Sequence, residues 1–209
     1  MAKLNEQCKL CRREGEKLFL KGDRCFSTKC AIVKRNYKPG VHGPQGKPSK
    51  MTDYGKQLRA KQAAKRMYSL TEKQFSNYIA KAMKKKENTT DMILKFLESR
   101  LDNVVYRLGF TTSRASARQF VGHGFLNING KKVDIPSYEV KPGDIISINA
   151  RKVNKKLVAE VSERTKTKET PIWIALDKEK MEAKVLGAPE LQQGEKLFDI
   201  QNVIEFYSR

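Results

Sequence analysis

The chain has 209 residues, of which 39% are hydrophobic and 32% charged, and its formal net charge is +20. This length corresponds to one or two domains, and no apolar run approaches the ~18 residues that a membrane-spanning helix needs. The first residues also lack the apolar stretch of a secretory signal. We therefore expect a cytoplasmic protein with no membrane partner.

The positive charge is concentrated toward the start of the chain. Residues 1–90 carry a net charge of +16, residues 91–168 carry +7 and residues 169–209 carry −3. Ordinary solubility needs a net charge of only ~2–8. A larger excess indicates a polyanionic partner with a regular array of phosphates, so nucleic acid is the predicted ligand.

Residues 1–50 are predicted to form an irregular segment that is rich in glycine and proline. Its cysteines are paired as Cys8-x2-Cys11 and Cys25-x4-Cys30, a spacing that lets four thiolates surround one ion. Zn²⁺ is the predicted cofactor, and a 4Fe-4S cluster at the same four cysteines is the alternative. Four protein ligands leave no open coordination position, so the predicted role of the metal is structural.

Two helices are predicted next, over residues 53–68 and 71–86. The first carries basic side chains around much of its circumference. The second begins at Thr71, and Gln74 three residues later completes a capping box. We expect the two helices to pack as a hairpin.

The segment 91–168 is predicted to be a small module of helices and strands. Apolar residues recur at helical spacing in its first part, and alternation around an Asn-Gly pair indicates a tight hairpin in its second. The predicted elements are helices over 92–108 and 114–122, a hairpin that turns at Asn129-Gly130, a strand over 145–148 and a helix over 153–165.

The tail, residues 169–209, is slightly acidic and too short for a core of its own. We predict that it folds back on the basic helices, and that the alternating segment from Asp199 to Tyr207 ends as a strand. The predicted fold class is α+β. It comprises a metal-stapled irregular segment (1–50), a mainly helical nucleic-acid-binding domain completed by the tail (51–90 plus 169–209), and an inserted small α/β module of two helices on a short antiparallel sheet (91–168).

Several motifs carry a family resemblance. Within 99–148 they are Ser-Arg-Leu-Asp102, Ser113-Arg114-x-x-Ala117-Arg118, Gly122-His-Gly124, Asn129-Gly130 and Lys141-Pro-Gly-Asp144. In this order they resemble the RNA-binding module named for small-subunit ribosomal protein four. The loop that starts at Asn36-Tyr-Lys-Pro-Gly, the segment from Asp53 and the C-terminal Ile-x-Phe-Tyr-Ser extend the resemblance over nearly the whole chain. The paired cysteines are similar to those of the metal-bearing bacterial variant of that family.

The resemblance implies a structural constituent of the small ribosomal subunit that is not an enzyme. It implies a primary binder of small-subunit ribosomal RNA, in the 5′ domain, that nucleates assembly of the subunit body and contributes to translational accuracy. The implied partners are neighbouring ribosomal proteins, chiefly protein five, and messenger RNA near the channel by which it enters the subunit. No homo-oligomer is expected. Some bacterial members also repress their own messenger, and no residue here tests that role.

The residues predicted to bind RNA are all basic. Arg114 and Arg118 are four residues apart, which puts two guanidiniums one helical turn apart on one face, as successive phosphates require. The full set is Arg12, Arg13, Arg35, Lys38, Lys47, Lys50, Lys56, Arg59, Lys61, Lys65, Arg66, Arg100, Arg107, Arg114, Arg118, Lys131 and Lys132.

Two other functions remain possible from the residues alone. An RNA-modifying enzyme similar to pseudouridine synthases could carry the same module, with its catalytic aspartate in an Arg-Leu-Asp motif such as Arg100-Leu-Asp102. Only 41 residues follow position 168, too few for a catalytic domain, so we expect Asp102 to form a salt bridge or a cap instead. A zinc-dependent DNA-binding regulator would want a recognition helix set by its metal site, and none is predicted.

Overall fold

The computed structural model describes residues 6–46, 50–85, 87–149, 155–190 and 198–208, with the side chains of 155–157 left aside. The chain divides into two compact units, one of residues 1–84 with 196–209 and the other of residues 85–195. Helices and antiparallel strands occur together, which confirms the predicted α+β class. No helix in the described ranges is long and apolar enough to cross a membrane.

The N-terminal part of the first unit contains three short helices, α1 (Gln7–Glu14), α2 (Asp23–Phe26) and α3 (Ala31–Lys34). Helix α1 contacts α3 and ends at Gly15, whose backbone takes the left-handed conformation with φ 81°. Glycine adopts that conformation without steric strain, so it ends the helix. The segment is therefore less irregular than its composition predicts, because a helix-forming stretch lies between its turns.

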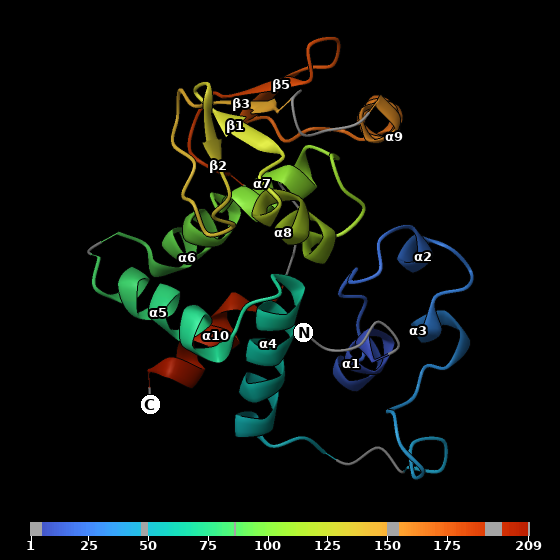
Figure 1. The fold of residues 1–209 in the computed structure, drawn as a ribbon. Helices are drawn as coiled ribbons and strands as arrows, with labels where there is room; N and C mark the ends of the chain where they lie inside the picture. Colours follow the sequence, from blue (N-terminus) through green and yellow to red (C-terminus); the bar gives the residue numbers. More distant parts are fainter. Residues whose placement is uncertain (1–5, 47–49, 86, 150–154, 191–197, 209) are drawn as a thin grey trace. The chain divides into compact units, whose positions relative to one another are not determined.

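The rest of the first unit consists of α4 (Asp53–Met67), α5 (Glu72–Met83) and α10 (Ile200–Tyr207). The Thr71 hydroxyl accepts a hydrogen bond from the backbone N–H of Gln74, and the Gln74 side chain completes the predicted capping box. Helix α10 contacts both α4 and α5 (Figure 1). Helices α4 and α5 therefore pack mainly through α10 and not directly on each other, as the predicted hairpin requires.

The last element is a helix, and the predicted strand at this place is wrong. The Asp199 carboxylate accepts a hydrogen bond from the backbone N–H of Asn202, which caps the helix N-terminus. Val203 is fully buried, and the Phe198 ring lies edge-on to Tyr68 at 6.1 Å. The cap and the apolar contacts therefore prevail over the strand-like alternation of the sequence.

Over its described residues, the second unit combines four helices with one antiparallel sheet. The helices are α6 (Thr89–Glu98), α7 (Leu101–Arg107), α8 (Arg114–Gly122) and α9 (Lys155–Thr167). The strands are β1 (Leu126–Ile128), β2 (Lys131–Val133), β3 (Ile145–Ile148), β4 (Ile174–Asp177) and β5 (Glu182–Val185), in the order β2-β1-β3-β5-β4.

The core of this unit lies between the sheet and helices α7 and α8 (Figure 1). Val104 and Val121 on the helices are fully buried, as are Leu126 and Ile146 on the strands. The predicted hairpin is present, with β1 and β2 joined at Asn129-Gly130, where both residues have positive φ. An Asn-Gly pair tolerates that conformation, which is why the turn can be this tight.

The boundaries differ from those expected from the sequence. Residues 174–185 form β4 and β5 and extend the sheet of the module, where Ala183 and Val185 turn toward the core. Only residues 198–208 of the described tail pack on the basic helices. Residues 1–50 belong to the same unit as those helices. The cause is strand pairing, because β5 finds its partner in β3 rather than in the helical unit.

Candidate nucleic-acid interface

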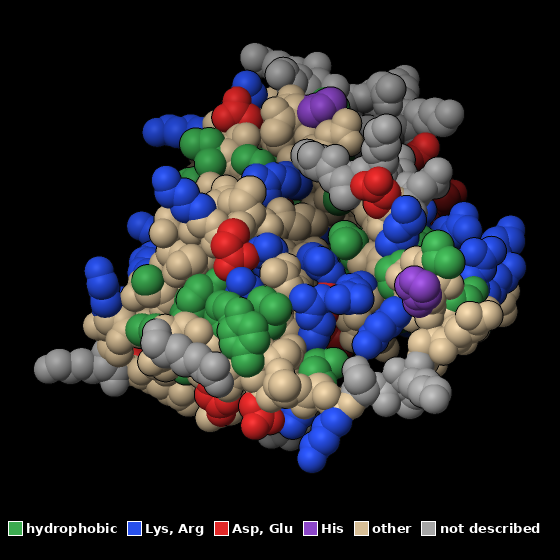
Figure 2. Space-filling view, turned by 90° about the horizontal axis from the view of Figure 1, so that it is seen from below, with side chains coloured by type: hydrophobic (Ala, Val, Ile, Leu, Met, Phe, Trp, Pro, Cys, Tyr) green, Lys and Arg blue, Asp and Glu red, His purple; other side chains and the backbone are tan. Residues whose placement is uncertain are grey.

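Basic side chains of the first unit lie mainly at its surface. Those with exposed residues are Arg13, Arg35, Lys38, Lys50 and Lys56, and those half-buried are Arg12, Arg59, Lys65 and Arg66. Lys47 lies outside the described residues. Figure 2 shows Lys and Arg side chains spread over the face drawn there, with a few Asp and Glu groups among them. A dispersed cationic surface of this kind suits the phosphates of a polyanion.

A buried carboxylate organises two of these cations. The Glu14 side chain is only 1% exposed, and its Oε1 accepts hydrogen bonds from Arg59 and Arg66. Burial raises the pKa of Glu14, while the two neighbouring guanidiniums oppose that rise. Arg59 and Arg66 nevertheless keep about a quarter of their side-chain surface exposed, at 27% and 23%. Glu14 therefore fixes their position and leaves part of each available to a ligand.

Lys61 lies buried inside the first unit, whereas the sequence predicts it at the RNA-binding surface. Its ammonium is 2.8 Å from Glu72 Oε1 and 4.4 Å from the centroid of the Phe206 ring, and only 8% of its side chain is exposed. Burial raises the pKa of Glu72, but hydrogen bonds from Lys61, Lys65 and Tyr207 outweigh it and lower the pKa to about 2. These contacts tie α4, α5 and α10 together. We therefore leave Lys61 out of the interface.

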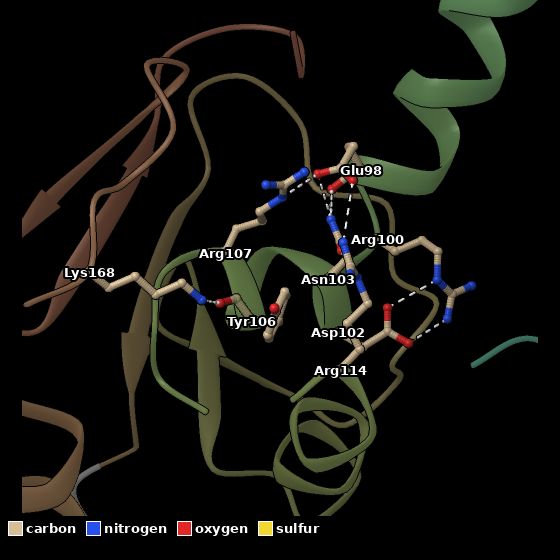
Figure 3. Close-up of polar contacts among 8 residues, drawn as sticks. All are labelled: Glu98, Arg100, Asp102, Asn103, Tyr106, Arg107, Arg114 and Lys168. Carbon is tan, nitrogen blue, oxygen red and sulfur yellow. Dashed lines mark hydrogen bonds and ion pairs between the residues drawn. The ribbon is translucent and has the colours of Figure 1, made fainter. Parts of the chain in front are cut away.

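A polar network lies inside the second unit (Figure 3). Glu98 Oε2 accepts hydrogen bonds from Asn103 Nδ2 at 2.8 Å and from Arg107 Nε at 2.9 Å. The other end of the Asn103 amide accepts a bond from Arg114 Nε at 2.7 Å. One buried carboxylate thus joins α6, α7 and α8 through two arginines and one amide, because buried charges need such partners. Arg107 and Arg114 serve the fold, which corrects their predicted role as phosphate ligands.

Arg100 and Asp102 form a separate buried pair at the start of α7. Two nitrogens of the guanidinium meet the two carboxylate oxygens at 3.0 and 2.6 Å (Figure 3). The side chains are 2% and 6% exposed. This geometry confirms the salt bridge expected for Asp102, and it leaves Arg100 out of reach of a phosphate. A fully paired carboxylate is also unsuited to act as the catalytic aspartate of an enzyme.

Tyr106 lies between two cations on the same network (Figure 3). The Arg114 guanidinium carbon is 4.6 Å from the centroid of the ring, and the Lys168 ammonium is 4.0 Å from it. The ammonium also donates to the backbone oxygen of Tyr106. Burial lowers the pKa of Lys168 to about 8, and the nearby charges of Arg107 and Arg114 contribute.

The predicted pair of guanidiniums on α8 does not form a common outer face. Arg114 points inward, whereas Arg118 is half-exposed. Lys131 and Lys132 on β2 are exposed, and Lys132 lies 3.2 Å from Asp134. The Lys132 side chain also passes over Gly124, next to the end of α8. Of the cations predicted to bind RNA in this unit, Arg118, Lys131 and Lys132 are thus the accessible ones.

The four cysteines of the first unit line one small cavity. Cys11, Cys25 and Cys30 are buried, Cys8 is half-buried, and all four are free thiols. Burial raises the pKa of Cys11 and Cys25, and the neighbouring cysteines raise it further. Among the described residues, however, no three His, Cys, Asp or Glu side chains converge closely enough to hold a metal ion. Four cysteine thiols are suitable ligands for a metal ion, but among the described residues they do not form a closed coordination shell.

Known proteins with similar sequences belong to the small ribosomal subunit. Residues 3–98 match the family described as Ribosomal protein S4/S9 N-terminal domain, and residues 99–146 match the S4 domain. The chain is 50% identical to the small ribosomal subunit protein uS4 of Kosmotoga olearia over 202 residues, which are 97% of this chain and 96% of that protein. The uS4 proteins of Syntrophomonas wolfei subsp. wolfei and Thermotoga petrophila are 50% and 47% identical, with the same coverage. The chain therefore belongs to the uS4 family of small ribosomal subunit proteins.

Proposed function

We propose that this chain is held in the small ribosomal subunit by ribosomal RNA, which its exposed cations bind through backbone phosphates. Its family is that of a structural protein of the small subunit and not of an enzyme. The observation that carries the proposal is identity of about half over nearly the full chain, combined with the cationic surface of the first unit.

The proposed RNA surface is smaller than the predicted set. It keeps exposed and half-buried side chains of both units and leaves out Lys61, Arg100 and Arg114, which are buried. It also leaves out Arg107, whose side chain is 16% exposed and bound to the buried Glu98. Structured RNA offers mainly phosphates and 2′-hydroxyls to a protein, so accessible Lys and Arg are the groups that can bind it. A buried guanidinium that is already paired cannot replace a counterion on RNA.

The more specific roles rest on the resemblance to the family. They are binding to the 5′ domain, nucleation of the subunit body, a contribution to translational accuracy, and contacts with protein five and with incoming messenger RNA. Reconstitution of subunits with and without the chain tests the assembly role. The expected result is that early body intermediates accumulate only when the chain is present.

The salt dependence of RNA binding tests the phosphate contacts. Arg35→Ala/Lys50→Ala removes two exposed cations, and we expect the slope of log K against log salt to flatten by about two contacts, about 0.7–0.9 each. Lys178→Ala/Lys180→Ala is the matched control, because it removes the same charge from an exposed turn outside the proposed surface. Equal flattening in both variants would show that general charge, not this surface, binds the RNA.

We also propose that Cys8, Cys11, Cys25 and Cys30 hold Zn²⁺, or alternatively a 4Fe-4S cluster. The support is the paired spacing and the placement of all four thiols around one cavity. A bound Zn²⁺ would supply a structural link between α1 and the start of α3. The thiols must lose their protons to bind a metal, and burial, which raises the pKa of Cys11 and Cys25, opposes this at those two residues.

Elemental analysis of the purified chain distinguishes the two cofactors. About one zinc per chain supports the ion, and iron with sulfide supports the cluster. Cys8→Ser/Cys11→Ser should abolish either and loosen residues 1–45, while the second unit keeps its own unfolding transition. Trp173 is the single tryptophan of the chain and lies in the second unit, so its fluorescence follows that unit selectively. Absence of both metals at full loading conditions would overturn the proposal.

A further inference from the structure

A groove in the first unit combines cationic, aromatic and apolar side chains. Its volume is about 630 Å³. It lies between the turn of residues 36–46, the end of α1 and the start of α4, and Tyr37, Met51 and Arg59 are among its lining residues. Pockets of this size suit an organic ligand rather than a single ion.

The apolar part of the groove is accessible. Tyr37 keeps 37% of its surface exposed, Met51 keeps 41% and Val41 keeps 90%. The Arg12 guanidinium covers the Tyr37 ring at 4.5 Å from its centroid. Contacts with phosphates alone need none of these apolar side chains. The ring of Tyr37, in a groove that Met51 also lines, offers instead a flat surface for another ring.

The charged part of the groove favours an anion. Arg12, Arg13, Lys38 and Arg59 line it, and the carboxylate among the lining residues, Glu14, has its side chain buried and paired with two arginines. A ligand in this groove therefore faces several cations and a carboxylate that is already neutralised.

The rim of the groove is built in advance of binding. Arg12 Nε donates to the backbone oxygen of Tyr37 at 2.9 Å, and its Nη2 donates to that of Lys38 at 3.3 Å. A Cβ atom at Gly43 would lie 1.9 Å from the Lys38 carbonyl oxygen, so only glycine allows the turn to close this tightly. Arg12 is thus a positioning residue for Tyr37. A fixed aromatic ring loses little conformational freedom when a ligand stacks on it.

We infer that this groove holds one unpaired nucleotide of RNA, with its base against Tyr37 and Met51 and its phosphates at Arg13 and Arg59. The inference rests on the proposed function and deepens it, because it names the RNA feature that the first unit selects. Bulges and loops of folded RNA present such unstacked bases, whereas a continuous helix does not.

The test uses the full chain and two RNA hairpins that differ by a single bulged uridine. We expect the bulged hairpin to bind more tightly, and Tyr37→Ala to lose most of that preference, by about 5- to 150-fold for one stacked base. Tyr37→Phe should retain the preference because the ring remains. Gly43→Ala should reduce it without removing any aromatic group, since it displaces the turn that carries Tyr37.

Two controls separate this inference from the proposed function. Tyr54→Ala removes an exposed tyrosine of the same unit outside the groove, and should leave the preference unchanged. With 5-iodouridine at the bulge, irradiation should join the base to Tyr37 or Met51. Equal affinity of the native chain for both hairpins, or attachment of the base in the second unit, would overturn the inference. The groove would then be assigned to binding of a protein segment. Failure to bind either hairpin at low salt would contradict the proposed function itself.

Discussion

The two units use arginine in opposite ways. In the second unit, Arg100 and Arg114 lie inside the fold and are bound to a carboxylate or an amide on a neighbouring residue. In the first unit, Arg59 and Arg66 share the buried carboxylate of Glu14 and still reach solvent. The acidic partner is buried in both units, with Glu14 1% and Asp102 6% exposed, so the difference lies in the arginines. Arg59 keeps 27% of its side-chain surface exposed and Arg100 keeps 2%.

This difference shows why a count of basic residues overstates an RNA interface. The net charge of a segment measures its attraction for a polyanion, whereas accessibility decides which side chains can bind one. The stabilities of the two units can be measured separately, because Trp173 is the single tryptophan and lies in the second unit.

The largest effect is expected for Asp102→Ala. It leaves the Arg100 guanidinium buried without the carboxylate that it binds through two nitrogens, and loss of one partner of a buried pair destabilises by about 3–5 kcal/mol. Denaturant unfolding followed by Trp173 fluorescence measures it. Asp134→Ala is the matched control, because its pair with Lys132 is half-exposed and contributes about 0–1 kcal/mol. Similar losses in the two variants would contradict the contrast between buried and exposed pairs.

The second unit should become more stable as the pH rises above 8. The pKa of Lys168 is lowered to about 8 from its ordinary 10.5, so between these values the unfolded chain binds more protons than the folded one. Relative to Lys168→Met, the native chain should gain on the order of 2–3 kcal/mol between pH 8 and 10.5. Fluorescence-detected melts at several pH values test this, with Lys131→Met as an exposed control. A difference that stays constant with pH would refute it.

Glu14→Ala should destabilise the first unit by about 1–2 kcal/mol. The loss is smaller than for Asp102→Ala because the guanidiniums of Arg59 and Arg66 can turn toward water once their carboxylate is gone. Circular dichroism should show the change while the Trp173 transition stays in place. A loss as large as that of Asp102→Ala would mean that both units depend on buried charge to the same degree.

The smallest effect is expected for Glu72→Gln, and it should appear only in part of the pH range. The pKa of Glu72 is lowered to about 2 from the usual 4.5, so its contribution is present above pH 4.5 and is lost as the pH falls toward 2. Because this side chain is 47% exposed, we expect only about 0.5–1 kcal/mol. Acid titrations of the two proteins, followed by circular dichroism, should converge near pH 2. Curves that remain parallel would exclude this role.

Much of the local structure could be predicted from the sequence because its signals are local. The capping box at Thr71, the tight turn at Asn129-Gly130 and the helix that starts at Arg114 depend on neighbours within a few residues. The helix at 200–207 was missed because its alternation resembles a strand, and only the Asp199 cap indicates otherwise.

The composition of the candidate site was harder to predict, because burial depends on distant partners. Glu98 meets Arg114 only when α6 and α8 both pack on α7, and Glu14 meets Arg59 across 45 residues. For Glu14, the sequence shows only a glutamate directly after two arginines, which does not indicate its distant partners. Tyr37 lies in a segment that the sequence marks only as similar to the family. The groove that it lines forms only when the turn of residues 36–46 is folded.

Because β3 pairs with β5, an isolated fragment that keeps the whole sheet must extend beyond β3 to include β5. The match to the S4 domain ends at residue 146, inside β3, while two of the sheet's five strands come from residues 174–185. A fragment trimmed at the family boundary would expose the hydrogen-bonding edge of β3 and uncover apolar side chains beside it, a combination that promotes self-association. The sheet of the second unit therefore extends some forty residues past the matched domain, to residue 185.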